Sequence, residues 1–398
     1  MIRRRSLLAL AGLGGATLAL PTTVAQAVPA PAPALTPAPA PAPATGRPRA
    51  ITLPAPTGDR PVGTVDLHLV DRSRRDPFAP VPGPRELMVQ LWYPALGTGG
   101  RPRAPYTTAR VAAVIDEILP VDPGTISTVR PSAHTGAPAV PGPLPLLLLG
   151  HGRTGGRSNC TALAEELASH GYLVAAIDHT YDAAAVEFPD GRLVRTVLSN
   201  DPPDRDATER KEIAARVGDL RFVATELTSR RPGRPSVDPR RIGVLGHSMG
   251  GAAAAEAVRQ DPRFVAGLNL DGGLFGSPVP ELGLDRPFLM LTSIADHETW
   301  QRWREHQRGW GRQLRVGGAG HLSYTDLVHV AVPGGLPGHV PADLYVAIIG
   351  TLAPARATEL TRAYTRAYFD RFLGNRRSPL LDGPSTRFPE IEFRWSHG

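Results

Sequence analysis

The chain has 398 residues, 41% of them hydrophobic, which is enough apolar material for one large domain or two ordinary ones. Basic residues exceed acidic ones by 44 to 37, but the excess is scattered arginine without a dense basic run beyond the N-terminus. This pattern argues against nucleic-acid binding and leaves only some attraction to anionic lipid surfaces. The lone cysteine, Cys160, excludes an intrachain disulfide and a cysteine-built metal site.

The first residues have the pattern of an export signal. Three arginines at positions 3–5 precede an apolar run over 7–20, and Ala25-Gln26-Ala27 fits an A-x-A cleavage site. Residues 1–27 are therefore predicted to be a secretion signal, and the Arg-Arg-Ser-Leu-Leu stretch also resembles a twin-arginine export signal. The apolar run is too short and too broken by glycine to span a membrane, and no later segment reaches that length. We expect a soluble protein outside the cytoplasm.

A Pro/Ala-rich linker is predicted over 28–49, and a folded domain over 50–398. Apolar periodicity in this domain predicts strands at 64–71, 86–93, 144–149, 172–178, 241–245, 264–270, 288–293 and 313–316. Helices are expected near 109–119, 158–170, 207–229, 249–260, 297–309 and 355–373. The alternation indicates an α/β fold with a mostly parallel central sheet, helices on both faces and an antiparallel hairpin at its start. No internal repeat is visible, so we expect one domain.

The stretch Gly246-His247-Ser248-Met249-Gly250 fits G-x-S-x-G between a predicted strand and a predicted helix. This context is typical of the nucleophile elbow of an α/β-hydrolase, where a sharp turn exposes the serine hydroxyl. Glycine at 246 and 250 removes the Cβ atoms where strand and helix crowd each other. Ser248 is therefore predicted to be a catalytic nucleophile, the alternative being a serine that only caps the helix.

A serine nucleophile needs a base, and in this fold the base is a histidine that follows the last strand. His321 fits, because the strand predicted at 313–316 ends in the glycine loop 317–320 that precedes it. His329 and His339 lie further along a Pro/Gly-rich segment and are expected at the surface or in a lid. We therefore favour His321 as the base.

The acid that orients the histidine has two candidates from the residues alone. Asp271 directly follows the strand 264–270, and Asp296 follows the strand 288–293. Both strand ends lie at the carboxyl edge of a parallel sheet, where such sites form. Asp296 holds the position more usual in α/β-hydrolases, whereas Asp271 is followed by two glycines that suit a carboxylate placed under a histidine. Asp296 could alternatively cap the next helix.

The oxyanion hole of this fold uses the N–H of the residue after the nucleophile and one N–H from a loop after an early strand. Met249 supplies the first. Arg153, in the glycine-rich turn 150–156, is expected to supply the second through its backbone, and His151 is expected to shape that turn. The turn lacks the G-K-[ST] ending of a phosphate-binding loop, and we find no cofactor signature and no metal-ligand spacing.

These residues resemble the platelet-activating factor acetylhydrolase family, the serine-dependent α/β-hydrolases of the plasma and intracellular type II class. The resemblance spans roughly residues 62–373, and its landmarks are Leu91-Trp92-Tyr93-Pro94, Gly150-His151-Gly152, Ala168-Ser169-His170-Gly171-Tyr172, Asp178-His179, Gly246 to Gly251, Asp261-Pro262-Arg263-Phe264, Leu270-Asp271-Gly272 and Gly320-His321. It implies that Asp271 is the acid, with Asp296 as the alternative. It also implies oxyanion donors at Met249 and Arg153, no metal, and release of short or oxidised acyl groups from phospholipids.

The chain departs from that family at positions that shape the substrate pocket. Met249 stands where members often have phenylalanine, and Gly272-Gly273-Leu274-Phe275 replaces an aromatic-rich stretch. The scaffold also resembles cutinase-like polyesterases and dienelactone hydrolases, so a general carboxylesterase is the alternative activity. A non-enzymatic binding protein on the same fold would lack the serine or the histidine, and both are present. The apolar segment 322–354 is predicted to be either a cap that contacts lipid or an elaborate loop.

Overall fold

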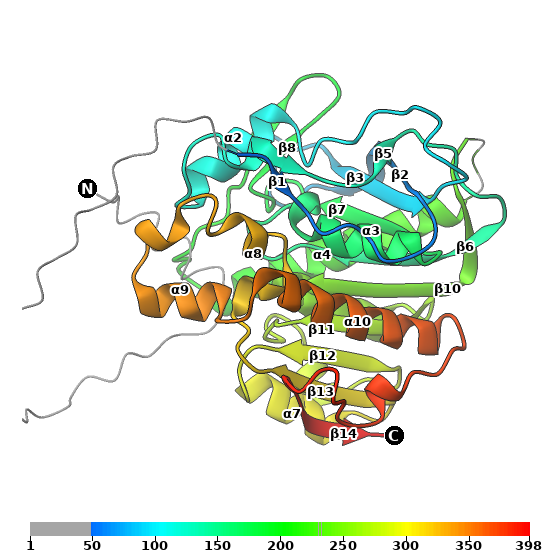
Figure 1. Ribbon diagram of the computed structural model, residues 1–398, viewed down its shortest axis with the longest axis vertical. Coiled ribbons are helices and arrows are strands. Elements are labelled where there is room, and N and C mark those ends of the chain that lie inside the picture. Colours follow the sequence, from blue (N-terminus) through cyan, green and yellow to red (C-terminus); the bar gives the residue numbers. More distant parts are fainter. Residues whose placement is uncertain (1–48, 230, 232) are drawn as a thin grey trace, which may run out of the picture.

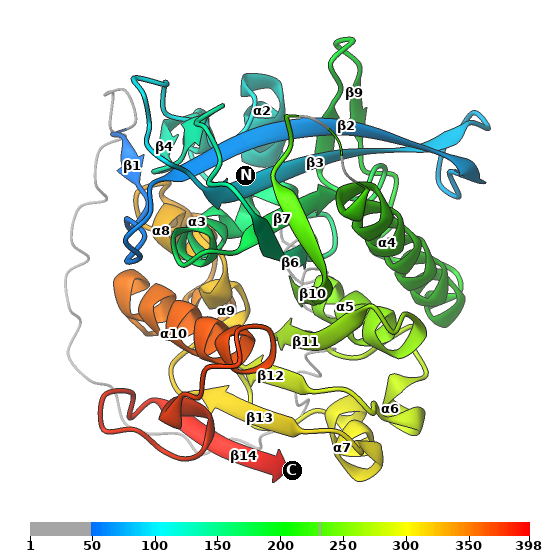
Figure 2. The same cartoon turned by 90° about the vertical axis from the view of Figure 1, so that its right-hand side faces the viewer.

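The computed structural model describes residues 49–229, 231 and 233–398, so the predicted export signal and nearly all of the linker lie outside the described residues. A twisted sheet of ten strands runs through the whole molecule (Figures 1 and 2). Its strands, in spatial order, are β14 (Ile391–His397), β13 (Gly311–Val316), β12 (Phe288–Thr292), β11 (Phe264–Leu270), β10 (Ser236–His247), β6 (Pro143–Gly150), β7 (Leu173–Asp178), β3 (Pro84–Pro94), β2 (Val62–Arg75) and β5 (His134–Thr135).

The centre of this sheet is parallel, as the sequence predicts. Strands β7, β6, β10, β11, β12 and β13 pair in parallel, and the predicted hairpin of β2 and β3 joins them through the antiparallel pair of β3 and β7. One edge differs from the expectation, because β14 adds an antiparallel strand beside β13 that we did not predict. Because the central strands are parallel, their carboxyl ends meet at one edge, where Ser248 and Asp271 follow β10 and β11.

Helices cover both faces of the sheet, and the side chains of each central strand alternate between them. On β6, Leu146 and Leu148 belong to one buried cluster, and Leu147 and Leu149 belong to the other. Figure 2 shows the two helical layers on opposite sides of the strands. The first layer contains α4 (Arg205–Thr228), α5 (Met249–Gln260), α6 (Val279–Leu282) and α7 (Glu298–His306), and the second contains α3 (Thr161–Ser169) and α10 (Pro354–Phe372).

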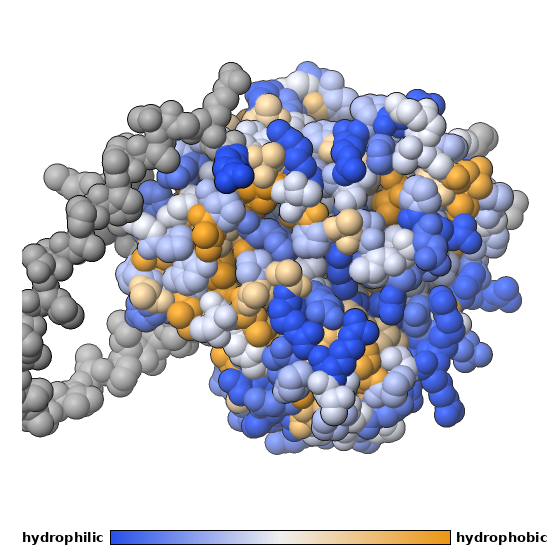
Figure 3. Space-filling model, viewed as in Figure 1, coloured by the Kyte–Doolittle hydropathy of each residue, from blue (hydrophilic) through white to orange (hydrophobic). Residues whose placement is uncertain are grey.

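A third apolar cluster lies beside the sheet and includes many of the apolar residues of the segment 322–354. The segment forms α8 (Leu327–Val330) and α9 (Ala342–Ile349), which pack with α2 (Ala109–Ile118) and with Ile51 and Leu53. Two short sheets complete the molecule, one of β1 (Ile51–Thr52) with β4 (Val129–Arg130) and one of β8 (Ala185–Glu187) with β9 (Leu193–Arg195). In this segment Val332 and Val346 stay 62% and 47% exposed. Figure 3 shows hydrophobic residues at the surface, interspersed with polar ones, in the region where Figure 1 places α8 and α9. Among the described residues, no helix is long and apolar enough to cross a membrane.

Candidate active site

Ser248 lies on a sharp turn between strand β10 and helix α5. Its backbone has φ 55° and ψ −124°, a region that non-glycine residues rarely adopt, so the turn holds it under strain. The glycines on either side are required by space: a Cβ at Gly246 would collide with the backbone of Gly250, and a Cβ at Gly250 would collide with the carbonyl oxygen of Gly150. The amide of Ser248 donates to the carbonyl oxygen of Leu270 at 2.8 Å, which ties the turn to the end of β11.

Asp271 and His321 lie together beside this turn. The Nδ1 atom of His321 is 2.8 Å from Oδ2 of Asp271, and Oδ1 of Asp271 accepts from the amide of Ser293 at 2.6 Å. The Ser293 hydroxyl lies 2.9 and 2.8 Å from the two carboxylate oxygens. The other ring nitrogen of His321, Nε2, is buried and makes no hydrogen bond within the part of the chain that the structure describes. A histidine held in this way has Nε2 left for a proton transfer.

His247, the residue before Ser248, links the turn to His321. The two imidazole rings are 4.7 Å apart between centroids, and the Nε2 atom of His247 lies 2.8 Å from the carbonyl oxygen of His321. Burial, together with the charge that His321 carries when protonated, lowers the pKa of His247 to about 3. His247 is therefore neutral at pH 7, and its Nε2–H is the donor to that carbonyl. The contact fixes the backbone of His321 against the serine turn.

The other candidates from the sequence are engaged elsewhere. Asp296 lies beside α7, where it accepts from the amide of His297 at 2.9 Å and pairs with Arg304 at 3.0 Å. His329 contacts the hydroxyl of Thr358 on α10 at 2.7 Å, and His339 contacts Asp122 at 3.2 Å. The structure thus brings Asp271 together with His321 and holds Asp296, His329 and His339 in separate contacts.

Two backbone amides near Ser248 are available as donors. Within the described residues, neither the amide of Met249 nor that of Arg153 donates a hydrogen bond. The loop that carries Arg153 adjoins the turn, since a Cβ at Gly152 would lie 3.3 Å from Cβ of Ser248. The Arg153 guanidinium points elsewhere and pairs with Glu212 at 2.9 Å. The charged side chain of Arg153 is thus engaged by α4, and the backbone of the neighbouring Gly152 adjoins the serine turn.

Sequence reasoning missed Ser293 and His247 as parts of this site. Ser293 directly follows β12, the strand beside β11. Its contact with Asp271 can be expected only once the order of β11 and β12 in the sheet is known. His247 lies inside the G-x-S-x-G stretch, but its contact partner is 74 residues away in the chain. Neither contact has a local signal, because both depend on which strands and loops become neighbours.

Comparisons with known proteins give relatives of this chain by sequence. The family described as "Platelet-activating factor acetylhydrolase, isoform II" matches residues 123–206, a range that contains the Arg153 loop and ends before the serine turn. A protein of Arthroderma benhamiae named "Probable 1-alkyl-2-acetylglycerophosphocholine esterase" is 28% identical over 87% of this chain and 94% of its own length. A platelet-activating factor acetylhydrolase of Cavia porcellus is 23% identical over 58% of each chain.

A solved structure is similar over almost its entire length. It is a ferulic acid esterase from Streptomyces cinnamoneus, and it superposes with a TM-score of 0.78 at 42% sequence identity. The superposition covers 86% of this chain and 98% of that one. The names of these relatives and of the solved structure all describe enzymes that cleave carboxylic esters.

Proposed function

Because the chain is a carboxylic-ester hydrolase of the α/β-hydrolase superfamily and a relative of the platelet-activating factor acetylhydrolases, we propose that it works through a Ser248–His321–Asp271 triad. The observation that carries the proposal is the 2.8 Å contact of His321 with Asp271 beside the strained turn of Ser248. Acyl transfer needs a serine, a carboxylate and a histidine, and in this fold they follow each other along the chain in that order.

Each group has a defined role in the proposed reaction. Nε2 of His321 takes the proton of Ser248 while the serine oxygen attacks the ester carbonyl, and Asp271 holds the imidazole and stabilises its charged form. The amides of Met249 and Arg153 donate to the oxyanion of the tetrahedral intermediate. His321 then protonates the leaving alcohol, and a water activated by the same histidine releases the acid from Ser248.

The substrate that we propose is a phospholipid with a short acyl group at the sn-2 position. Its support is the named activity of the Arthroderma benhamiae relative and of the matching family. The exposed side chains of Val332 and Val346 lie in the segment 322–354, which begins directly after His321, and they also suit contact with a lipid surface. A second candidate is an ester of an aromatic acid, which is favoured by the 42% identity to the ferulic acid esterase.

A panel of esters separates these candidates. We expect p-nitrophenyl acetate to be cleaved. We expect kcat/KM for 1-alkyl-2-acetylglycerophosphocholine to exceed that for methyl ferulate at least about tenfold, since contacts to the acyl and head groups in the transition state distinguish the two esters. The measurement is initial-rate kinetics on these esters and on a polyester film. A higher kcat/KM for methyl ferulate than for 1-alkyl-2-acetylglycerophosphocholine would replace the phospholipid by the aromatic ester as the proposed substrate. Cleavage of the polyester film alone would indicate a polyesterase.

Export is part of the proposal, with residues 50–398 as the catalytic domain. Its support is the arginine-rich start, the apolar run and the Ala25-Gln26-Ala27 site in the sequence. Expression in a bacterium with both export routes is expected to yield extracytoplasmic protein that begins at Val28. N-terminal sequencing checks this expectation, and an intact start at Met1 in the active protein would contradict it.

A further inference from the structure

Helix α4 presents a buried polar ridge to the loops at the catalytic edge of the sheet. Glu212, Arg216 and Asp219 follow each other at intervals of four and three residues, so they share one face of the helix, and each is 0% exposed. Burial of charged groups is costly unless each is paired and hydrogen-bonded. A ridge of three such groups in an otherwise apolar helix–sheet interface therefore has to be explained by what it contacts.

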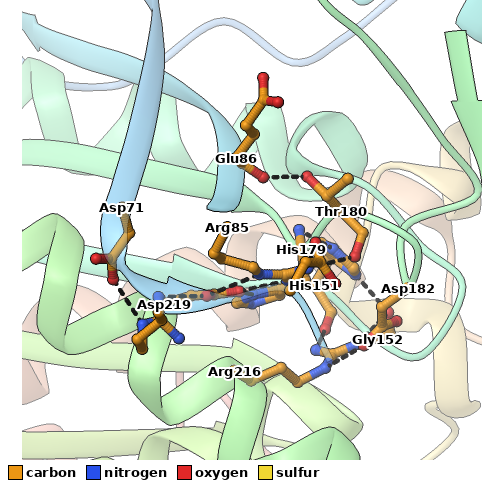
Figure 4. A network of polar contacts seen from close by, with 12 residues as sticks. Asp71, Arg85, Glu86, His151, Gly152, His179, Thr180, Asp182, Arg216 and Asp219 are labelled. Carbon is orange, nitrogen blue, oxygen red and sulfur yellow. Dashed lines mark hydrogen bonds and ion pairs between the residues drawn. The ribbon is translucent and has the colours of Figure 1, made fainter. Parts of the chain in front are cut away.

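Arg216 contacts the loop that carries Arg153 (Figure 4). Its Nε and Nη2 atoms each lie 2.7 Å from a carboxylate oxygen of Asp182, which leaves its remaining donors free for the backbone. Nη1 donates to the carbonyl oxygen of His151 at 2.5 Å, and Nη2 donates to that of Gly152 at 3.3 Å. The guanidinium thus holds two successive carbonyl groups of one loop.

The carbonyl oxygen of Gly152 has a second donor. Nδ1 of His151 lies 2.6 Å from it, and the amide of His179 donates to Nε2 of the same ring at 3.2 Å. Because Nε2 accepts, the proton of the neutral ring is on Nδ1. Burial and the nearby charge of Arg216 lower the pKa of His151 well below its usual value, so the neutral ring prevails at pH 7. The amide of Gly155 also donates to this oxygen, at 3.0 Å, so three donors fix the direction of the carbonyl.

The direction of the Gly152 carbonyl sets the direction of the Arg153 amide. The peptide group between them is planar and trans, so its C=O and N–H bonds point to opposite sides. Arg216 approaches the carbonyl from α4, and the N–H consequently points away from α4. The same loop touches the serine turn, since a Cβ at Gly152 would lie 2.9 Å from Nδ1 of His247.

The side chain of Arg153 is held by the same ridge. Its Nε and Nη2 atoms each lie 2.9 Å from an oxygen of Glu212, one helical turn before Arg216 on α4. Nη2 also donates to the carbonyl oxygen of Ser199 at 2.8 Å. Arg153 is thus fixed on two sides, through its guanidinium and through the peptide that precedes it.

We propose that Arg216 is a positioning residue that aims the Arg153 amide at the oxyanion, with Glu212 as its partner on the same ridge. This inference rests on the proposed function, because it assigns a cause to the direction of one proposed oxyanion donor. The hydrogen bonds to the Gly152 carbonyl oxygen also polarise the peptide group, which strengthens its N–H as a donor.

The test compares Arg216→Lys with Arg85→Lys. Arg85 is also 0% exposed and pairs with Asp219 at 2.7 Å and Asp76 at 2.7 Å, but it donates only to carboxylates and to the Thr180 carbonyl oxygen, none of them in the Arg153 loop. A lysine at 216 has three donors on one nitrogen, so it cannot reproduce the two contacts with Asp182 together with both carbonyl contacts. Removal of one oxyanion donor costs about 10²–10³-fold in kcat, so a misdirected donor is expected to cost about 10- to 100-fold.

Steady-state kinetics on p-nitrophenyl acetate and the binding of an inhibitor decide the outcome. We expect Arg216→Lys to lower kcat about 10- to 100-fold with KM within about twofold, and to weaken binding of a trifluoromethyl ketone in parallel with the loss of kcat/KM, since that ketone forms the oxyanion. Arg85→Lys is expected to keep kcat within about twofold even where it lowers the melting temperature. Equal kcat values for the two variants would overturn the inference.

Two further results keep this test distinct from that of the proposed function. Fluorophosphonate labelling of the unaltered protein at Ser248, combined with full activity of Arg216→Lys, would overturn the inference alone; absence of that label would overturn both. If Arg216→Lys does not fold, Arg153→Met is decisive, because it removes the pairing of the Arg153 guanidinium with Glu212 and keeps the backbone amide. A fall in its kcat supports the inference, and an unchanged kcat contradicts it.

Discussion

Replacement of Ser248 by alanine is expected to lower kcat for p-nitrophenyl acetate by about 10⁴-fold or more, because the substitution removes the only atom that can carry the acyl group in the proposed reaction. The change deletes a single oxygen from a side chain that is 6% exposed and keeps the backbone turn. The melting temperature should therefore change little, which separates loss of chemistry from loss of fold.

Mass spectrometry supplies the second measurement for this variant. A fluorophosphonate should add one label to the unaltered protein, on the peptide that contains Ser248, and no label to Ser248→Ala. Ser127→Ala is a matched control, since that hydroxyl is exposed and donates only to the carbonyl oxygen of Gly124. A label on another residue, or activity retained in Ser248→Ala, would refute the nucleophile assignment.

The elements around the serine turn could be predicted from the sequence because each carries a strong local signal. The apolar run 264–270 and the alanine-rich segment 249–260 became β11 and α5 with the predicted bounds. Strand β11 is buried on both faces, between the two helical layers, where a continuous apolar run is required, and α5 packs on one of these faces. Gly246 and Gly250 marked the turn because no other residue fits between the crossing backbones.

The strand β14 was missed although its sequence alternates. Ile391, Phe393 and Trp395 alternate with polar residues, a pattern typical of a half-buried strand, and Phe393 pairs opposite Leu314 of β13. More than seventy residues and three α-helices, α8, α9 and α10, separate the partners in the chain. Local periodicity could therefore predict the strand, but its position at the sheet edge depends on a long-range pairing.

The contacts of the α4 ridge could not be predicted from local sequence either. Glu212, Arg216 and Asp219 belong to a helix with charged residues on several sides, where a charged position usually indicates a solvated face. Only the fold places these three against loops that end β6 and β7. The choice between Asp271 and Asp296 also needed the fold or a family resemblance, because both residues follow strands at the same edge.

Replacement of Asp271 by asparagine is expected to lower kcat by about 10⁴-fold, through the tautomer of His321. The amide of Ser293 donates to Oδ1 of Asp271, so an asparagine keeps its oxygen at that place and turns its NH₂ group toward the histidine. The NH₂ group donates to Nδ1 of His321, which moves the ring proton to Nε2. A histidine protonated at Nε2 cannot take the proton of Ser248.

Asp296→Asn is the matched comparison, since Asp296 is the other acid that follows a strand at this edge. It pairs with Arg304 at the surface, so its replacement should leave kcat within about twofold and cost at most about 1 kcal/mol of stability. Steady-state kinetics on p-nitrophenyl acetate measure kcat, and ¹⁵N chemical shifts of His321 report which ring nitrogen carries the proton. A fully active Asp271→Asn, or a crippled Asp296→Asn, would transfer the role of the acid to the second carboxylate, because only one of them can set the tautomer of a single imidazole.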